Sequence, residues 1–319
     1  MTQQTAQAYP VKQISKKPKM TFLDKLLRDK FLYLLALPGL LYFLVFKYLP
    51  IYGLIIAFKE YSPYIGIMES PWVGFEHFKR FFSYNDFWLL LRNTMGISLM
   101  NLFLFFPVPI LLAVMLNEIA NQKFKRTVQT IVYLPHFLSW VIIYGVTYLL
   151  FSSYEGLVNK IIMSVGLKSF DFLTNQSIFW LVVTIQSMWK EAGWGTVIFL
   201  ASISGIDPSL YEAARMDGAS RLKQIWHVTL PGIRNTIVVL LILRMGNIID
   251  VSFDQLYLMG NAAVSQVAEV FDTYVYRTGI NQGQYSYSAA IGFFKSIIGF
   301  TLVMITNKIA KSFGNEGVY

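Results

Sequence analysis

Six long apolar runs alternate with polar segments along this chain of 319 residues, and the alternation predicts the fold. Most of the runs have the roughly 17–25 residues that a helix needs to cross about 30 Å of hydrocarbon. Backbone amides in lipid must form hydrogen bonds within their own segment, so each run is predicted to be a helix. The six expected spans are Phe31–Phe46, Asn93–Leu116, Thr130–Phe151, Phe179–Ile203, Ile233–Ile249 and Ser288–Thr306.

Composition supports this interpretation. The chain is 55% hydrophobic and 14% charged, whereas an ordinary soluble domain has about 25% charged residues. It has no cysteine, which excludes a disulfide framework, a zinc–thiolate site and a catalytic thiol. The predicted fold class is therefore all-α, a polytopic bundle of six transmembrane helices.

Lysine and arginine are distributed unevenly over the segments that join the runs. If the N-terminus lies inside the cell, the inner segments hold 16 of the 27 Lys and Arg residues and the outer segments hold 8. This twofold excess is the positive-inside pattern, and it predicts that both termini are cytoplasmic. The inner segments also hold 7 Asp and Glu residues, and their surplus of nine bases then faces anionic lipid headgroups, at about 1 kcal/mol per basic residue near the surface. No nucleic-acid partner is needed to explain it.

The spans divide the chain into three parts. Residues 1–30 are expected to be a cytoplasmic tail that ends in an interfacial helix with Phe22, Leu23, Leu26 and Leu27 on its apolar face. Residues 31–306 form the six-span domain, and residues 307–319 a second cytoplasmic tail. The first run is expected to be retained, because no signal-peptidase cleavage site follows it.

A polar segment, residues 207–231, lies between the fourth and fifth runs and has the terminal residues of two short helices. Asp207 suits an N-cap, and Pro208 suits the first helical position. Gly218 stands where a left-handed C-cap belongs. A second helix is expected beyond it and should end at Pro231. The pattern predicts a cytoplasmic helical loop that is either a docking surface for a partner or an ordinary connection.

The loop resembles the EAA loop of bacterial ABC-importer permeases. The family pattern is E-A-A-x-x-x-G, followed further on by I-x-L-P, and here Val228 replaces the isoleucine with another β-branched side chain. The resemblance covers residues 25–306, and within the family the chain is most similar to the LplB-like and rhamnogalacturonan-oligosaccharide branch. The loop residues that match the EAA pattern are Glu212, Ala213, Ala214, Asp217, Gly218, Leu230 and Pro231.

The resemblance implies a mechanism and partners. Two such permeases pair, usually as two different chains, and each EAA loop docks into one of two cytoplasmic ATPases. ATP-driven closure of the ATPases alternates access to the path, and an extracellular solute-binding lipoprotein delivers the sugar. On this basis Glu212 makes a polar contact to the ATPase, Ala213 and Ala214 pack closely against it, and Gly218 permits the turn. The implied location is the bacterial cell membrane.

The energy source is expected in a partner chain. The sequence has no G-x-x-x-x-G-K-[ST] loop, and His77, His136 and His227 are far apart in sequence. The chain is therefore predicted not to be an enzyme and to bind no cofactor, with ATP and Mg held by the ATPase.

Charged residues inside the spans are candidates for the substrate path. Lys190 and Glu191 lie near the middle of the fourth span, Arg244 in the fifth and Lys295 in the sixth. Ionisable groups in the membrane are costly unless they are paired or hydrated. One acid cannot neutralise three bases, so the path is predicted to be partly positive and to suit an acidic, pectin-derived oligosaccharide. The alternative is that Glu191 pairs with a base on another span simply to hold the bundle.

Aromatic and polar residues extend the candidate path. Trp189 and Trp194 flank the charged pair away from the interfacial belt, so they are either sugar platforms or packing residues. The outer segment 250–287 is rich in hydrogen-bonding groups, among them Tyr274 and Arg277. One amphipathic helix is expected there, with Val264, Val267, Phe271 and Tyr274 on its apolar face.

The function hypothesis is the permease subunit of an ATP-driven ABC importer for oligosaccharides. The alternative is a secondary transporter of another polar solute with no ATPase partner, because such proteins also have buried charges and broken helices. The chain has no convincing internal repeat, but Pro107 and Pro109 are expected to break the second span, as this alternative requires.

Overall fold

The computed structural model describes residues 28–84 and 86–312. These residues are almost entirely helical, and their only strand-like feature is an isolated bridge between Lys59 and Trp72. The all-α prediction is therefore confirmed for the described part of the chain. The chain divides into two units, which are considered separately: Met1–Leu54 and Ile55–Tyr319.

The first unit is helical throughout its described residues. α2 (Lys30–Phe43) continues through a π-helical turn, η1 (Leu44–Tyr48), into the 3-10 helix η2 (Leu49–Phe58), whose later residues belong to the second unit. No residue of α2 or η1 is buried, although most are apolar. Large exposed apolar side chains on a helix this long are expected when the solvent is lipid.

The second unit contains the remaining helices of the described residues. In chain order they are α3 (Gly66–Glu69), α4 (Glu76–Ser83), α5 (Phe87–Met100), η3 (Asn101–Phe105), α6 (Pro107–Asn117), α7 (Gln122–Tyr133), η4 (Leu134–Phe137), α8 (Trp140–Phe151), α9 (Leu157–Ser164), α10 (Phe179–Ser204), α11 (Pro208–Met216), α12 (Arg221–Gln224), η5 (Ile225–Thr229), α13 (Leu230–Gly232), α14 (Arg234–Gly246), α15 (Phe253–Met259), α16 (Ser265–Ala268), α17 (Phe271–Tyr276), η6 (Arg277–Asn281) and α18 (Tyr285–Ser312).

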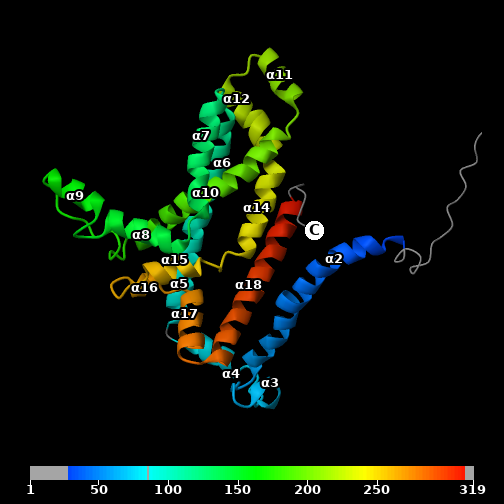
Figure 1. The fold of residues 1–319 in the computed structure, drawn as a ribbon, viewed down its shortest axis with the longest axis vertical. Helices are drawn as coiled ribbons and strands as arrows, with labels where there is room; N and C mark the ends of the chain where they lie inside the picture. Colours follow the sequence, from blue (N-terminus) through cyan, green and yellow to red (C-terminus); the bar gives the residue numbers. More distant parts are fainter. Residues whose placement is uncertain (1–27, 85, 313–319) are drawn as a thin grey trace, which may run out of the picture. The chain divides into compact units, whose positions relative to one another are not determined.

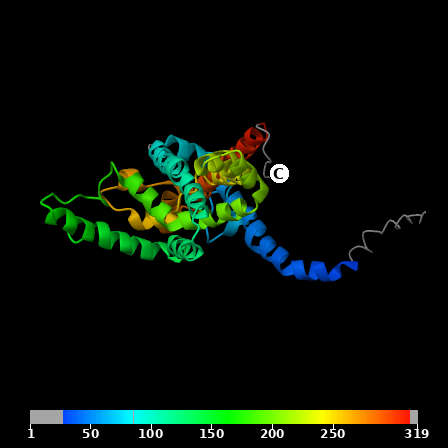
Figure 2. The same cartoon turned by 90° about the horizontal axis from the view of Figure 1, so that it is seen from above.

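Two helix pairs organise this unit. α10 packs along α6, and α14 packs along α18. Figure 1 shows α11 and α12 at one end of the unit and α4, α16 and α17 toward the other. In Figure 2, which looks along the unit from above, α8 and α9 project sideways from the other helices.

Three groups of buried apolar side chains form the core. One lies around Phe179 and Val183 of α10, a second around Phe81 and Phe271, and a third around Phe199 near the end of α10. α10 contributes to two of the three groups, so its position fixes those of several neighbours. The rest of the apolar surface is exposed, as a membrane-embedded chain requires.

The number of spans is only partly supported by length and composition. Among the described residues, three helical stretches are long and apolar enough to cross a membrane: 30–58, 87–117 and 285–312. Two bent pairs, 122–151 and 221–246, raise the number to five if each pair forms one span. α10 has 26 residues, about 39 Å at 1.5 Å per residue, but its middle is polar.

The third predicted span is not one straight helix. α7 ends at Tyr133, and after η4 the chain turns by 106° into α8. Pro135 removes a backbone donor at this point, and the Ser139 hydroxyl caps α8 by accepting a bond from Ile142 N–H at 3.4 Å. The expectation of a continuous helix over Thr130–Phe151 was therefore wrong.

Two further expectations change at segment boundaries. The single amphipathic helix expected in the outer segment is replaced by two short helices, α16 and α17, which are separated at Glu269 and Val270. Residues 307–312, assigned to the second tail, continue α18. The interfacial helix proposed for Phe22–Leu27 and the tail beyond residue 312 lie outside the described residues.

Close packing of α10 on α7 gives a stability prediction. A methyl group at Gly193 would lie 2.2 Å from the backbone oxygen of Val132, whereas one at Gly145 of α8 would meet no atom within 4 Å. Gly193→Ala should lower the thermal unfolding temperature of the detergent-solubilised protein, because overpacking costs about 1–3 kcal/mol. Gly145→Ala should leave it unchanged or raise it slightly. Equal stability of the two variants would contradict the observed contact.

Candidate functional site

The loop between α10 and α14 begins with a capped helix. The Asp207 carboxylate accepts a hydrogen bond from the backbone N–H of Ser209 at 2.9 Å. This bond lowers the pKa of Asp207, because it favours the charged carboxylate. Pro208 is the first residue of α11, where no intrahelical N–H bond is lost. The start of the helix predicted from the sequence is confirmed.

α11 ends at a left-handed glycine, also as predicted. Gly218 has a φ of +73°. The N–H groups of Gly218 and Ala219 donate to the carbonyl oxygens of Arg215 and Ala214 at 3.0 and 2.9 Å, which closes the last turn. A side chain at position 218 would meet no atom within 4 Å, so the requirement for glycine is conformational rather than steric.

The second helix of the loop runs slightly further than predicted. α12 continues through the π-helical turn η5 into α13, and the 58° bend into α14 follows Gly232 rather than Pro231. Pro231 is the second residue of α13, which directly follows this π-helical turn. The Tyr211 hydroxyl of α11 lies 3.0 Å from the Thr229 hydroxyl and joins the two helices.

The loop presents a mixed polar and apolar surface. Glu212, Ala213, Asp217 and Gly218 are exposed, and Ala214 is half-buried. The large side chains of Met216, Leu222 and Trp226 are also exposed. Apolar side chains gathered on an otherwise polar loop mark a contact surface. Leu230 packs against the core around Phe199, and Pro231 remains exposed.

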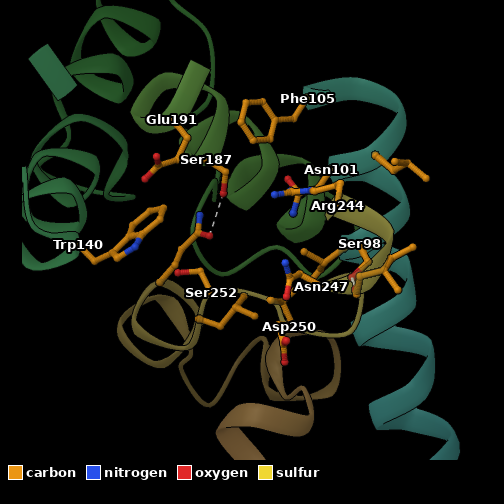
Figure 3. Close-up of a pocket in the computed structure, with 16 residues that line it drawn as sticks. Ser98, Asn101, Phe105, Trp140, Ser187, Glu191, Arg244, Asn247, Asp250 and Ser252 are labelled. Carbon is orange, nitrogen blue, oxygen red and sulfur yellow. Dashed lines mark hydrogen bonds between the residues drawn. The ribbon is translucent and has the colours of Figure 1, made fainter. Parts of the chain in front are cut away.

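A polar cavity lies between α5, α10, α14 and the segment that follows α14. Its volume is about 240 Å³. Figure 3 shows its charged and polar side chains converging from these elements, with Phe105 and Trp140 as aromatic walls. The Ser187 hydroxyl donates to the side-chain oxygen of Gln255 at 2.9 Å across one side. The labelled lining residues are Ser98, Asn101, Phe105, Trp140, Ser187, Glu191, Arg244, Asn247, Asp250 and Ser252.

Lys190, a residue of the predicted path, does not line this cavity. It is 6% exposed, and its ammonium donates to the backbone oxygens of His136 and Leu138, each at 2.8 Å. These carbonyl groups belong to the break between η4 and α8. Lys190 therefore satisfies backbone groups that the bend leaves without helical partners.

Glu191 does line the cavity and is held by two basic side chains. Its carboxylate lies 2.7 Å from Nδ1 of His136 and 3.4 Å from the ammonium of Lys190. Trp194 stacks on the His136 ring with centroids 4.9 Å apart and so supports this group. Trp194 is not among the residues that line the cavity.

Lys295 is neutralised by two carboxylates. Its ammonium pairs with Asp272 of α17 and, at 2.8 Å, with Asp250, which also lines the cavity. The sequence argument that Glu191 was the only acid available to the three bases was therefore wrong. It counted Asp250 and Asp272 with the outer segment, although both reach a base in the sixth predicted span.

Among the residues that line the cavity, Arg244 is the one with a lysine or arginine side chain. Its guanidinium carbon lies 5.5 Å from the ring centre of Phe105. No carboxylate of the described residues lies within 4 Å of it, unlike the ammonium groups of Lys190 and Lys295. Arg244 is therefore the sequence-predicted base that keeps its donors available to the cavity.

The remaining predicted path residues lie elsewhere. Trp189 lines an apolar cavity of about 640 Å³ between α8 and α10. Tyr274 is buried, with its hydroxyl 3.3 Å from that of Tyr287. Arg277 donates from Nε to Glu269 at 2.8 Å and lines a separate cavity of about 410 Å³. The structure thus brings together Glu191 and Arg244, and not the whole predicted set.

Several cavity residues were not identified from the sequence. Asn101 is an amide in the interior of an apolar run, which is a recognisable signal for a functional position in a membrane span. Ser187 lies one helical turn before Glu191 and gives a weaker signal of the same kind. Gln255 and Ser252 belong to a segment whose return to the bundle is set by tertiary structure, so nothing local in the sequence indicated them.

Comparison with known proteins identifies similar chains. Residues 105–314 match the family model described as binding-protein-dependent transport system inner membrane component. The polygalacturonan/rhamnogalacturonan transport system permease protein YteP of Bacillus subtilis (strain 168) is 50% identical over 304 residues, which are 95% of each chain. The protein LplB of the same organism is 50% identical over 300 residues, which are 94% of each chain.

A solved structure has the same fold. A chain of a bacterial alginate ABC transporter, in complex with an alginate pentasaccharide-bound periplasmic protein, superposes with a TM-score of 0.86. It is 37% identical, and the match covers 93% of the present chain and 99% of that chain. The likeness therefore extends over nearly the whole length of both chains.

The contacts of Lys190 give a stability prediction that separates a structural role from a transport role. Lys190→Met keeps the length of the side chain but leaves two buried carbonyl oxygens without donors, at about 1–3 kcal/mol each. The thermal unfolding temperature of the detergent-solubilised protein should fall. Lys168→Met, at an exposed position after α9, should leave it unchanged. Unchanged stability in Lys190→Met would refute the structural role.

Proposed function

This chain belongs to the family of binding-protein-dependent transport system inner membrane components, and we propose that it is the permease subunit of an ATP-driven importer of oligosaccharides. It is a membrane transport component rather than an enzyme. The main support for the proposed substrate class is the 50% identity, over 95% of both chains, to a permease named for polygalacturonan and rhamnogalacturonan. A secondary transporter is disfavoured, because the family works with a binding protein.

The proposed topology has six spans, with both termini in the cytoplasm. The excess of Lys and Arg in the inner segments supports this orientation. The three apolar stretches supply three spans, each bent pair supplies one through the part that follows its cytoplasmic residues, and α10 supplies the sixth. In this arrangement residues 31–306 are the permease domain, residues 207–231 its coupling loop, and residues 1–30 and 307–319 cytoplasmic segments.

The coupling loop is proposed to transmit ATPase movement to the spans. α11 is short, capped at both ends and exposed, so it can enter a groove as a rigid body. Glu212 provides a polar contact, Ala213 and Ala214 allow close approach, and Asp217 and Gly218 set the turn. Leu230 and Pro231 carry the movement into α14 through the 58° bend.

The proposed partners are those of a complete importer. They are a second permease chain, homologous but different, two cytoplasmic ABC ATPase subunits and an extracellular solute-binding lipoprotein. ATP and Mg would be bound by the ATPases and not by this chain. Membrane lipid surrounds the bundle, and no nucleic acid takes part.

The proposed substrate is an acidic oligosaccharide of the kind released from pectin. The name of one relative specifies polygalacturonan, and a second solved transporter, 38% identical, is described as importing the acidic polysaccharide alginate. The polar cavity with Arg244, Glu191 and two aromatic walls is the proposed path through this chain. Trp189, Trp194, Tyr274, Arg277 and the buried bases Lys190 and Lys295 are proposed to support the path from outside the cavity.

The coupling assignment predicts a loss of ATPase stimulation. In the assembled transporter, Glu212→Lys reverses a charge on α11, and Gly218→Leu forces a branched residue into a left-handed conformation at a cost of about 1 kcal/mol or more. Both variants should lose most sugar-stimulated ATP hydrolysis while the permease remains folded. The measurement is hydrolysis in proteoliposomes together with co-purification of the ATPase.

A matched control separates coupling from backbone strain. Gly166 also has a positive φ, +82°, with no atom within 4 Å of an added side chain, and lies in the proposed outer loop after α9. Gly166→Leu introduces the same strain away from the ATPase and should keep the stimulation. If Gly218→Leu and Gly166→Leu behave alike, the coupling assignment fails.

The topology predicts one-sided labelling. Because the chain has no cysteine, single cysteines can be placed without background at the exposed positions Lys123, Lys223 and Gln282. An impermeant thiol reagent added to intact cells should label position 282 and not positions 123 or 223. Permeabilised cells should be labelled at all three. Labelling of position 223 in intact cells would overturn the six-span arrangement.

A further inference from the structure

A π-helical turn shapes one wall of the polar cavity. Between α5 and α6, residues Asn101–Phe105 form η3, and both Asn101 and Phe105 line the cavity. π-helical turns inside α-helices widen the helix locally and occur often at functional sites. Figure 3 shows Asn101 and Arg244 next to each other, with Phe105 above them.

Asn101 carries an unused acceptor in this wall. The residue is 8% exposed, and its Oδ1 has no hydrogen-bond partner among the described residues. Buried polar atoms in folded proteins nearly always have a partner. The atom has almost no accessible surface, so it can accept a bond from a donor in the cavity, such as the hydroxyl group of a bound sugar, once the amide group rotates toward the cavity.

Arg244 supplies the complementary donors. The two carboxylates that line the cavity are held by other bases: Glu191 by Lys190 and His136, and Asp250 by Lys295. No carboxylate of the described residues lies within 4 Å of the Arg244 guanidinium, which rests against the Phe105 ring. A planar guanidinium with free N–H groups binds a carboxylate through two parallel hydrogen bonds.

We propose that Arg244 and Asn101 form a recognition site for one uronic acid unit. Arg244 binds the ring carboxylate, the Asn101 amide rotates toward the cavity and accepts a bond from a ring hydroxyl, and Trp140 and Phe105 bound the sugar. The cavity volume of about 240 Å³ lies just below the roughly 300 Å³ at which sites for drug-sized ligands begin, so it fits a single ring of an oligosaccharide. This inference rests on the proposed function and names the pair that determines its specificity.

Substitutions at Arg244 and Asn101 distinguish recognition of the carboxylate charge from recognition of a sugar in general. Arg244→Gln removes the charge and should weaken handling of acidic sugars about ten- to a hundredfold, as expected for charge-assisted hydrogen bonds. It should leave neutral sugars unaffected. Arg244→Lys keeps the charge without the planar geometry and should recover part of the loss. Asn101→Leu removes the hydroxyl acceptor and should impair acidic and neutral sugars equally.

Two measurements on the complete transporter test the proposal. Uptake of digalacturonate and of galactobiose into proteoliposomes is compared for the parent and the three variants. Binding of galacturonate and galactose, which differ at C6, is then measured by saturation-transfer NMR on transporter without binding protein, so that delivery does not set the preference. Arg126→Gln, at an exposed position of α7, serves as the control for loss of an arginine and should match the parent.

The outcomes are distinct. A selective loss of the acidic sugars in Arg244→Gln, in both measurements, supports the recognition site. An equal loss of both sugars in Arg244→Gln, or no loss, overturns it, while uptake of either disaccharide by the parent keeps the proposed function intact. If the parent transports neither disaccharide and binds neither monosaccharide, the proposed function and the recognition site fail together.

Discussion

The break between α7 and α8 is the feature on which the rest of the second unit depends. A chain in lipid cannot leave backbone carbonyl groups without donors, yet a 106° turn at residues 138–139 removes the helical partners of several. Lys190 resolves this conflict by donating to the backbone oxygens of His136 and Leu138. The cost of burying its charge is offset because those carbonyl groups and Glu191 surround it. α10 is thereby fixed against the turn, which sets the positions of Glu191 and Trp140 in the cavity wall.

The need to satisfy every buried polar or charged group also determines which base gives the cavity its positive charge. A base buried without a partner would be strongly unfavourable, so Lys190 and Lys295 are each satisfied by groups that surround them. Arg244 faces the cavity and pairs with no carboxylate of the described residues, which is tolerable because the cavity is polar and its guanidinium lies against Phe105. The positive character predicted for the path is therefore reduced from three bases to one. A single well-placed guanidinium gives geometric selectivity for a carboxylate, which a diffuse positive region would not.

Local features were predictable from the sequence, and long-range pairings were not. The N-cap of Asp207 and the left-handed Gly218 depend on a few neighbouring residues, so both were predicted and both were found. α10 was predicted as one helix because its apolar run has no internal break. The turn at Pro135 was missed because the surrounding apolar run satisfied the criterion for a span. The partners of Lys295 were missed because Asp272 approaches it only after the segment following α14 folds back, and no periodicity in the sequence encodes that return.

α10 connects the two candidate functional regions directly. Ser187 and Glu191 of this helix line the cavity, and the helix ends at Ser204, three residues before the Asp207 cap of α11. Ser204 lies 13 positions after Glu191, a separation of about 20 Å at 1.5 Å per residue, and the helix between them has no proline or π-helical turn. A helix of this kind, packed along α6, moves as a rigid element. In the proposed mechanism, displacement of α11 by the ATPase would therefore be delivered to the Glu191 side of the cavity. The coupling loop leads at its other end into α14, and Arg244 lies in the last turn of that helix. One movement of the coupling loop would therefore act on both sides of the proposed sugar site.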